Sequence, residues 1–313
     1  MSKIFEALSK AGGEIFEALP PVFEEELQPR EGIAQDDTDA SAVRMVLGDP
    51  EVSSPVPVVS TLAHETPQIR ELAIHLSGLA PLLPFDNTNY AAAEQYRIIR
   101  TRLIQHPKQP RMILISSAGP GDGKSVTAVN VAGALSLKTE ANVLLADTDF
   151  RRSTIHSQLG LPAAPGLADV LSGGATLEEA LIRTKQFPNL YVISAGRHCA
   201  NPSELLDSTQ WSTICNQLRS RFRYVIADSP PVASVADYEL LQATCDGVVL
   251  VVRPDHTKRQ ACMKAIEIIP KDKLIGVVMN CVSEWFLARD DYSYYDSKGR
   301  GAGARNEPGN LHS

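Results

Sequence analysis

The chain has 313 residues, of which 43% are apolar and 21% are charged, and its net charge is −7. This composition is close to that of an average globular protein, which excludes a fibrous or wholly disordered chain. No run of about 18 apolar residues is present, as a membrane-spanning helix would need, and the N-terminus lacks the features of a secretory signal. Five widely spaced cysteines predict reduced thiols of a cytoplasmic protein and exclude a zinc site.

The first part of the chain is acidic and rich in proline. Residues 1–60 contain 12 Asp or Glu residues and 4 Lys or Arg residues. We therefore predict a mostly disordered extension over residues 1–86, with a helical turn near Ile69–Leu79. At its start the pattern Ile-Phe-Glu-Ala-Leu occurs twice, at Ile4–Leu8 and Ile15–Leu19. The i, i+4 spacing of its apolar residues predicts a short amphipathic helix at residues 3–19, either a hook for a partner protein or a helix packed on the protein's own body.

Residues 87–282 have the texture of an α/β domain, and residues 283–313 that of a flexible tail. Strands without polar alternation are expected at Met112–Ser116, Val143–Ala146, Leu190–Ser194, Tyr224–Ala227, Gly247–Val252 and Leu274–Met279. Helices are expected at Tyr90–Gln105, Ser125–Leu137, Leu167–Leu171, Leu177–Arg183, Trp211–Ser220, Ala236–Thr244 and Lys258–Ile269. Apolar strands that alternate with helices predict a largely parallel sheet sandwiched by helices, with its ligand at the carboxyl ends of the strands.

A glycine-rich loop directly follows the first of these strands and leads into a helix. Such a loop points successive backbone N–H groups at phosphate oxygens, and the helix N-terminus adds a partial positive charge. Lys124 is placed to reach the β- and γ-phosphates and the Ser125 hydroxyl to bind Mg²⁺, although Ala118 replaces the usual first glycine. The predicted nucleotide-binding residues are Ala118, Gly119, Pro120, Gly121, Asp122, Gly123, Lys124, Ser125 and Val126. The alternative, a strand–helix turn with an incidental Lys-Ser pair, does not explain the complete pattern.

Carboxylates stand at the ends of two other strands. Asp147 and Asp149 end the strand at Val143–Ala146, and Asp228 ends the strand at Tyr224–Ala227. An aspartate after an apolar run is often only a turn or cap residue. In a chain that also has a phosphate-binding loop, these residues and Ser125 are the candidate ligands of Mg²⁺, directly or through water. We therefore expect ATP and Mg²⁺ as cofactors.

Together these motifs resemble the deviant P-loop ATPases, and most closely the bacterial protein-tyrosine kinases (BY-kinases) of capsule and exopolysaccharide biosynthesis. The resemblance extends over residues 87–282 and includes the run Asp147–Arg152 and Asp228-Ser229-Pro230-Pro231. It implies a P-loop NTPase-like fold and transfer of the γ-phosphoryl group of ATP to tyrosine. Lys124, Asp147 and Asp149 are the implied catalytic residues, with Asp147 accepting the tyrosine proton and Asp149 supporting the metal. Asn280 is the residue implied to contact the base.

The resemblance also implies self-assembly and autophosphorylation. Glu94, Arg97 and Arg100 match the family's E-x-x-R-x-x-R motif for a homo-oligomeric ring, and a solvated charged helix face is the alternative. The tail contains Tyr292, Tyr294 and Tyr295, which match the family's acceptor cluster. A transmembrane polysaccharide co-polymerase is the implied activator. The protein would then be cytoplasmic and held at the inner face of the membrane by that partner.

Two other functions remain open on the sequence alone. One is a Min/Par-like ATPase switch, and the other is a nucleotide-binding regulator of an export complex without kinase activity. Min/Par proteins typically have a signature lysine five positions before the P-loop lysine, where this chain has Gly119. The chain also lacks the clustered Lys and Arg residues of a DNA-binding surface, so no nucleic-acid partner is expected.

Overall fold

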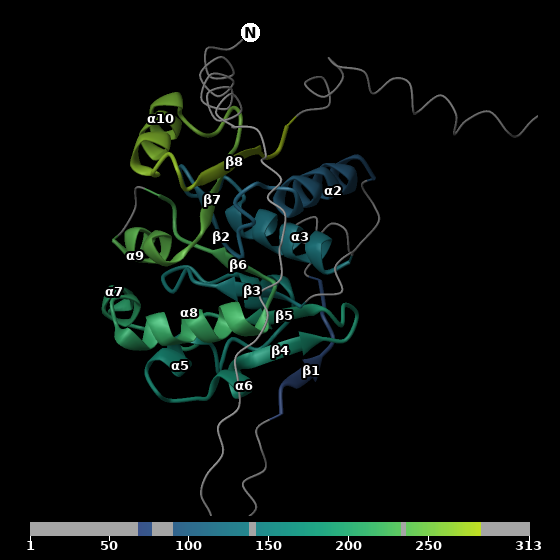
Figure 1. Cartoon of the computed structure of the whole chain (residues 1–313), viewed down its shortest axis with the longest axis vertical. Coiled ribbons are helices and arrows are strands. Elements are labelled where there is room, and N and C mark those ends of the chain that lie inside the picture. Colours follow the sequence, from purple (N-terminus) through teal and green to yellow (C-terminus); the bar gives the residue numbers. More distant parts are fainter. Residues whose placement is uncertain (1–67, 77–89, 138–141, 233–235, 283–313) are drawn as a thin grey trace, which may run out of the picture. The chain divides into compact units, whose positions relative to one another are not determined.

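The computed structural model describes residues 68–76, 90–137, 142–232 and 236–282 (Figure 1). These residues all belong to the second of two compact units, Glu65–Ser313. The amphipathic helix expected at 3–19 and the tyrosines expected in the tail lie outside the described residues.

An eight-stranded sheet forms the centre of this unit, in the order β1-β4-β5-β3-β6-β2-β7-β8. All neighbouring strands run parallel except β4 and β5, which are antiparallel. Most central strands are buried along their whole length because helices cover both faces. The strands are β1 (Arg70–Leu72), β2 (Met112–Ser117), β3 (Val143–Asp147), β4 (Leu181–Thr184), β5 (Leu190–Ile193), β6 (Tyr224–Asp228), β7 (Gly247–Val252) and β8 (Leu274–Met279).

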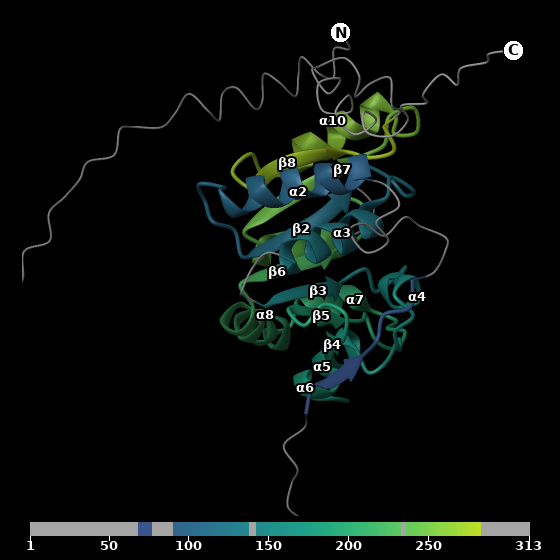
Figure 2. The same cartoon turned by 90° about the vertical axis from the view of Figure 1, so that its right-hand side faces the viewer.

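The helices divide between the two faces of the sheet, as Figures 1 and 2 show from two sides. One face packs against α2 (Tyr90–Ile104), α3 (Lys124–Ser136) and α4 (Ile155–Gln158). The other packs against α5 (Leu167–Leu171), α6 (Leu177–Ala180), α7 (Pro202–Leu206), α8 (Thr209–Arg221), α9 (Asp237–Thr244) and α10 (Arg259–Ile268). Alternate residues of β2 enter the two cores, Leu114 on one side and Ile113 on the other. The predicted α/β sandwich is confirmed.

Two strands were missed by the sequence analysis. The helix expected at Leu177–Arg183 ends at Ala180, and Leu181–Thr184 continues as β4. A capping box between Thr176 and Glu179 starts the helix, but the buried residues that follow pair with β5 instead of extending it. The helical turn expected near Ile69–Leu79 is also wrong over its described part, because Arg70–Leu72 forms β1 against β4. The sheet therefore includes residues from the segment assigned to the extension.

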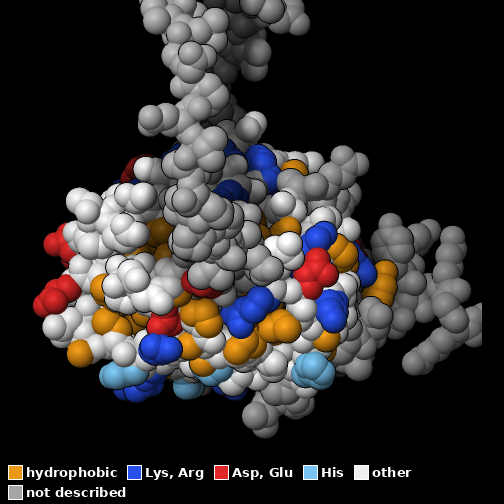
Figure 3. All heavy atoms as spheres, turned by 90° about the horizontal axis from the view of Figure 1, so that it is seen from below, with side chains coloured by type: hydrophobic (Ala, Val, Ile, Leu, Met, Phe, Trp, Pro, Cys, Tyr) orange, Lys and Arg blue, Asp and Glu red, His pale blue; other side chains and the backbone are white. Residues whose placement is uncertain are grey.

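No helix in the described ranges has the length and apolarity to cross a lipid bilayer. On the face of the molecule that Figure 3 shows, basic side chains are interspersed with acidic and apolar ones.

Candidate active site

The glycine-rich loop connects β2 to the N-terminus of α3 at the carboxyl edge of the sheet. Because β2 lies between β6 and β7, the loop has the end of β6 on one side and the β7–α10 loop on the other. Gly121 and Gly123 adopt φ values of 84° and 92°, in the left-handed region that favours glycine. The backbone thus curls directly before Lys124, as a phosphate-binding loop requires.

The loop is held from behind by residues that come late in the sequence. The Asp122 carboxylate is buried, and it accepts hydrogen bonds from the Gly119 N–H at 2.9 Å and the Thr257 hydroxyl at 2.7 Å. The Asn280 amide donates to the Asp122 carbonyl oxygen at 2.9 Å. The Asp122 side chain and the Gly119 N–H are therefore occupied within the protein, and we assign both residues to shaping the loop. Sequence reasoning had no signal for Thr257.

A side chain at Gly123 would displace the Asn280 amide and strain a backbone with φ of 92°, so Gly123→Ala is expected to weaken Mg-ADP binding by at least about tenfold. A Cβ atom there would lie 1.9 Å from Asn280 Nδ2, which forces the amide off the loop. Gly173→Ala is the matched control, because Gly173 has a similar φ of 75° but open space around it. The control is expected to lose only about 1 kcal/mol of unfolding free energy from backbone strain. Calorimetric titration with Mg-ADP measures both; equal losses of affinity would contradict the role of the Asn280 contact.

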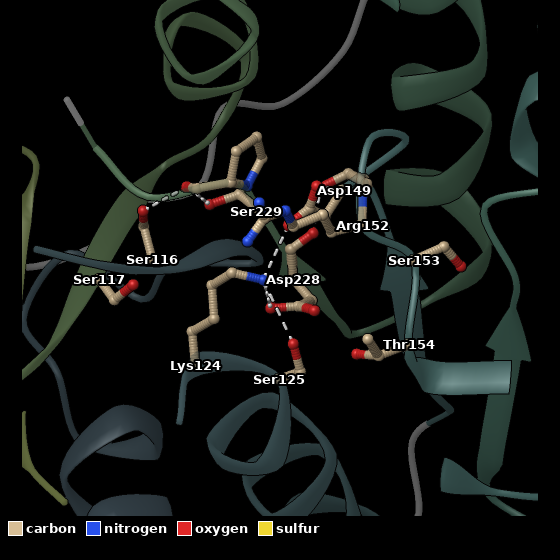
Figure 4. Close-up of polar contacts among 12 residues, drawn as sticks. Ser116, Ser117, Lys124, Ser125, Asp149, Arg152, Ser153, Thr154, Asp228 and Ser229 are labelled. Carbon is tan, nitrogen blue, oxygen red and sulfur yellow. Dashed lines mark hydrogen bonds and ion pairs between the residues drawn. The ribbon is translucent and has the colours of Figure 1, made fainter. Parts of the chain in front are cut away.

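Lys124 joins the loop to the carboxylates at the ends of β3 and β6 (Figure 4). Its Nζ lies 2.9 Å from Asp149 Oδ2 and 3.5 Å from Asp228 Oδ1. The Ser125 hydroxyl is 3.3 Å from the same Nζ. The register of the sheet causes this convergence, because Asp147 and Asp228 are paired neighbours in adjacent parallel strands. Four of the predicted site residues are therefore brought together, namely Lys124, Ser125, Asp149 and Asp228.

Burial controls the ionisation of this cluster. It raises the pKa of Asp228 to about 7, and the positive charge of Lys124 only partly offsets this. It also raises the pKa of Asp147 to about 6, against hydrogen bonds from Ser153 and the Ile155 N–H. Burial lowers the pKa of Lys124, but the charges of Asp228 and Asp149 outweigh it, so that this pKa is raised. Lys124 is therefore protonated, and it faces more carboxylates than one cation can neutralise.

Asp147 and Asp149 have different surroundings. Asp147 Oδ2 accepts from the Ser153 hydroxyl at 2.8 Å and from two backbone N–H groups at the start of α4, at 3.2 Å each. Asp147 is fully buried and does not line the cavity described below. Asp149, in contrast, lines it and holds Lys124. The geometry thus favours Asp149 for contact with reactants, and Asp147 for fixing the loop between β3 and α4. The resemblance implies the opposite assignment, and the catalytic roles of both residues stay predictions.

The surroundings of Asp228 are those expected of a metal ligand. It is fully buried, and neither of its carboxylate oxygens has a hydrogen-bond partner among the described residues. Within the same residues no group of three or more His, Cys, Asp or Glu side chains is arranged to hold a metal ion. Mg²⁺ does not need one, since it keeps several waters and takes phosphate oxygens alongside one or two protein ligands. Ser125 and Asp228 fit such a site, with Asp149 beside them.

A cavity of about 560 Å³ opens beside the cluster. It is lined on one side by the loop and the first residues of α3 and on the other by the segment that follows β3. Its lining residues are Pro120, Gly121, Gly123, Lys124, Ser125, Val126, Asp149, Arg151, Arg152, Thr154, Gln158, Pro230 and Pro231. Its volume is in the range of small-molecule sites. Neither Ala118 nor Asn280 lines it; the Asn280 side chain packs on the loop backbone instead.

The remaining predicted residues are the charged motif of α2, Asn280 and the tail tyrosines. Glu94 and Arg97 form an ion pair of 2.8 Å on α2, whereas Arg100 donates to the Ala134 carbonyl oxygen of α3 at 3.3 Å. One arginine of the motif thus connects two helices of the same chain. Asn280 lies after β8, and its contact with a base stays a prediction. Tyr292, Tyr294 and Tyr295 lie outside the described residues.

Comparisons with known proteins show which family and fold the chain shares. The AAA domain family matches residues 110–273. The tyrosine-protein kinase YwqD of Bacillus subtilis is 34% identical over 210 residues, which cover 66% of this chain and 87% of that protein. The crystal structure of the chimerical protein CapA2B2 is 29% identical with a TM-score of 0.63, and covers 70% of this chain and 95% of that one. The BceF tyrosine kinase domain is 32% identical with a TM-score of 0.53, over 59% and 76% of the two chains.

Proposed function

Because the chain belongs to the AAA domain family and, within it, to the bacterial tyrosine-protein kinases, we propose that its cavity binds Mg-ATP and transfers the γ-phosphoryl group to a tyrosine hydroxyl. The kinase is favoured over the Min/Par-like switch and the non-catalytic regulator by relatives with 30–37% identity that are named tyrosine-protein kinases. The convergence of Lys124, Asp149 and Asp228 on one cavity supports this assignment most directly.

Each residue of the cluster has a distinct part in this proposal. The loop amides and Lys124 bind the phosphate chain, and Ser125 and Asp228 hold Mg²⁺, which when bound neutralises charge on the β- and γ-phosphates. Asp149 lines the cavity. Its proposed role is to orient the tyrosine hydroxyl and to accept its proton. A tyrosine has a pKa near 10 in water, so a positioned base is needed for attack at neutral pH.

The proposed acceptors are Tyr292, Tyr294 and Tyr295, within the tail 283–313, supplied by a neighbouring copy in a ring. The ring would use Glu94, Arg97 and Arg100 of α2, of which Glu94 and Arg97 are already paired to each other. Each phosphate adds about −1.5 to −2 charges to a segment that already contains Asp290, Asp291 and Asp296. Repeated phosphorylation is therefore expected to weaken docking of the tail and loosen the ring.

The proposed setting is the control of polysaccharide polymerisation or export. The activator would be a transmembrane co-polymerase, which would hold this protein at the inner face of the membrane. The part of residues 1–86 that precedes β1, with its Ile-Phe-Glu-Ala-Leu repeat, is the segment proposed to bind that activator.

Replacing the three tail tyrosines tests whether they are the phosphate acceptors without changing the nucleotide-binding site. Tyr292→Phe/Tyr294→Phe/Tyr295→Phe is expected to remove at least nine-tenths of the phosphotyrosine formed with Mg-ATP, while Mg-ADP still binds with unchanged affinity. Mass spectrometry of the full chain, incubated with and without the cytoplasmic part of a co-polymerase, maps the sites. Tyr224→Phe is the control because that residue is buried in β6. Phosphotyrosine elsewhere would refute the proposed acceptors, and ATP turnover without any phosphotyrosine would refute the kinase.

A further inference from the structure

We propose that Arg152 binds the γ-phosphoryl group and stabilises the charge that develops on it during transfer. This inference rests on the proposed function, because it concerns the same cavity. Arg152 belongs to the segment between β3 and α4, and it lines the cavity together with Lys124 and Asp149. Figure 4 shows its side chain extending toward Lys124.

Arg152 differs from the other two basic residues that line the cavity in that its side chain has no acidic partner among the described residues. Lys124 is paired with Asp149 and Asp228. The neighbouring Arg151 forms two hydrogen bonds with the buried Asp237, of 2.7 and 3.1 Å. In the described part of the chain, the Arg152 guanidinium has no ion pair or hydrogen bond, although its backbone N–H donates to Asp149 Oδ1 at 3.0 Å. Arg152 is thus the lining cation whose charge remains free for a ligand.

The anchoring of its backbone sets where this side chain can reach. Asp149 Oδ1 holds the Arg152 N–H, and the other oxygen of Asp149 holds Lys124. The bidentate pair of Arg151 with Asp237 fixes the preceding residue, so Arg152 projects from an ordered segment into the cavity. A ligand phosphate that reaches Lys124 therefore also comes within reach of the Arg152 guanidinium.

The chemistry of phosphoryl transfer needs such a group. A bond forms from the tyrosine oxygen to the γ-phosphorus, the bond from that phosphorus to the bridging oxygen breaks, ADP leaves, and the hydroxyl proton passes to Asp149. Negative charge spreads over the three equatorial oxygens, and a guanidinium can donate to two of them at once. An arginine finger that stabilises the transferred phosphoryl group contributes about 10³–10⁵ in kcat in GTPases.

The alternative ligand is a carboxylate of the acceptor, since Asp290, Asp291 and Asp296 flank the tail tyrosines. The γ-phosphate is favoured because Arg152 extends toward Lys124 and because Lys124 alone faces at least two carboxylates. The two ligands can be told apart by a nucleotide that lacks the γ-phosphate.

Arg152→Ala and Arg152→Lys in the full chain test the proposal by calorimetric titration with Mg-ADP and with a non-hydrolysable Mg-ATP analogue. Arg152→Ala is expected to weaken binding of the analogue by about tenfold or more and to leave Mg-ADP binding within about twofold. Arg152→Lys keeps the charge but loses the two-pronged donor, so it is expected to lie between the wild type and Arg152→Ala. With two tyrosine peptides, one acidic and one neutral, Arg152→Ala is expected to lower kcat by the same factor, about 100-fold or more.

Arg197→Ala is the matched control, because this exposed arginine lies outside the cavity. It is expected to leave all three measurements unchanged. Equal losses of ADP and analogue affinity in Arg152→Ala would overturn the proposal in favour of a structural role. Unchanged nucleotide binding with a raised KM for the acidic peptide alone would overturn it in favour of acceptor recognition. Failure of the wild type to bind either nucleotide would instead refute the proposed function.

Discussion

Lys124→Met is expected to lower the rate of tyrosine phosphorylation by about 10³-fold or more. Lys124 is the cation at the centre of the cavity, 2.9 Å from Asp149 and 3.5 Å from Asp228. Without it, the β- and γ-phosphates lose their main contact with a positive charge and meet buried carboxylates instead. Methionine has a similar length and no charge, so the substitution removes the interaction with little change of shape. Quantitative mass spectrometry of phosphotyrosine over time measures the effect.

The same substitution has a second consequence in the nucleotide-free protein. The remaining carboxylates lose their cation, so the pKa of Asp228 rises further and its charged form becomes more costly. We expect Lys124→Met to be less stable than the wild type at pH 8 and to approach it as the pH falls to 5. Lys271→Met is the control because Lys271 is exposed. Retention of more than about a tenth of the wild-type rate would contradict the role of Lys124.

The contiguous part of the site could be predicted from the sequence, because a phosphate-binding loop is encoded by adjacent residues. Strand, glycines, lysine and helix follow each other between residues 112 and 136, and the structure has each of them in place. The parallel sheet could be predicted as well, since its strands are apolar along their whole length. That prediction places the ends of β3 and β6 at the same edge of the sheet, and the structure adds that the two strands are direct neighbours.

The features that could not be predicted from the sequence depend on contacts between residues that are distant in the chain. Thr257 holds Asp122 across 135 positions, and no local pattern indicates such a pair. Asp147 and Asp149 look alike in the sequence, yet one faces the start of α4 and the other faces the cavity. Strand β4 was missed because a helix-starting capping box directly precedes it and its pairing with β5 decides the outcome. Local propensity yields to such tertiary contacts.

Asp228→Asn is expected to abolish phosphorylation and, at the same time, to stabilise the nucleotide-free protein. Asp228 is fully buried, neither of its oxygens accepts a hydrogen bond from the described residues, and burial raises its pKa to about 7. In the unfolded chain its pKa is near the ordinary value of 3.8, so between these values the folded state binds more protons than the unfolded state. The contribution of Asp228 to stability therefore falls as the pH rises from about 4 to 7, and the asparagine variant lacks this loss. Its advantage at pH 8 is expected to be about 1–3 kcal/mol.

Asp237→Asn is the matched control, because the same substitution at an equally buried carboxylate should have the opposite sign. Burial acts to raise the pKa of Asp237, but the hydrogen bonds from Arg151 and Ser203 outweigh it and the pKa is lowered. Its charge therefore stabilises the fold above pH 4 and stops doing so as the pH falls through the lowered value. Asp237→Asn is expected to cost about 1–2 kcal/mol at pH 8, because the charge-assisted hydrogen bonds to the buried carboxylate are lost, while the exposed Arg151 can still be solvated by water. Urea unfolding of both variants at pH 5 and 8 measures these differences. A loss of stability in Asp228→Asn at pH 8 would mean that Asp228 is held by contacts within the protein and does not await a cation.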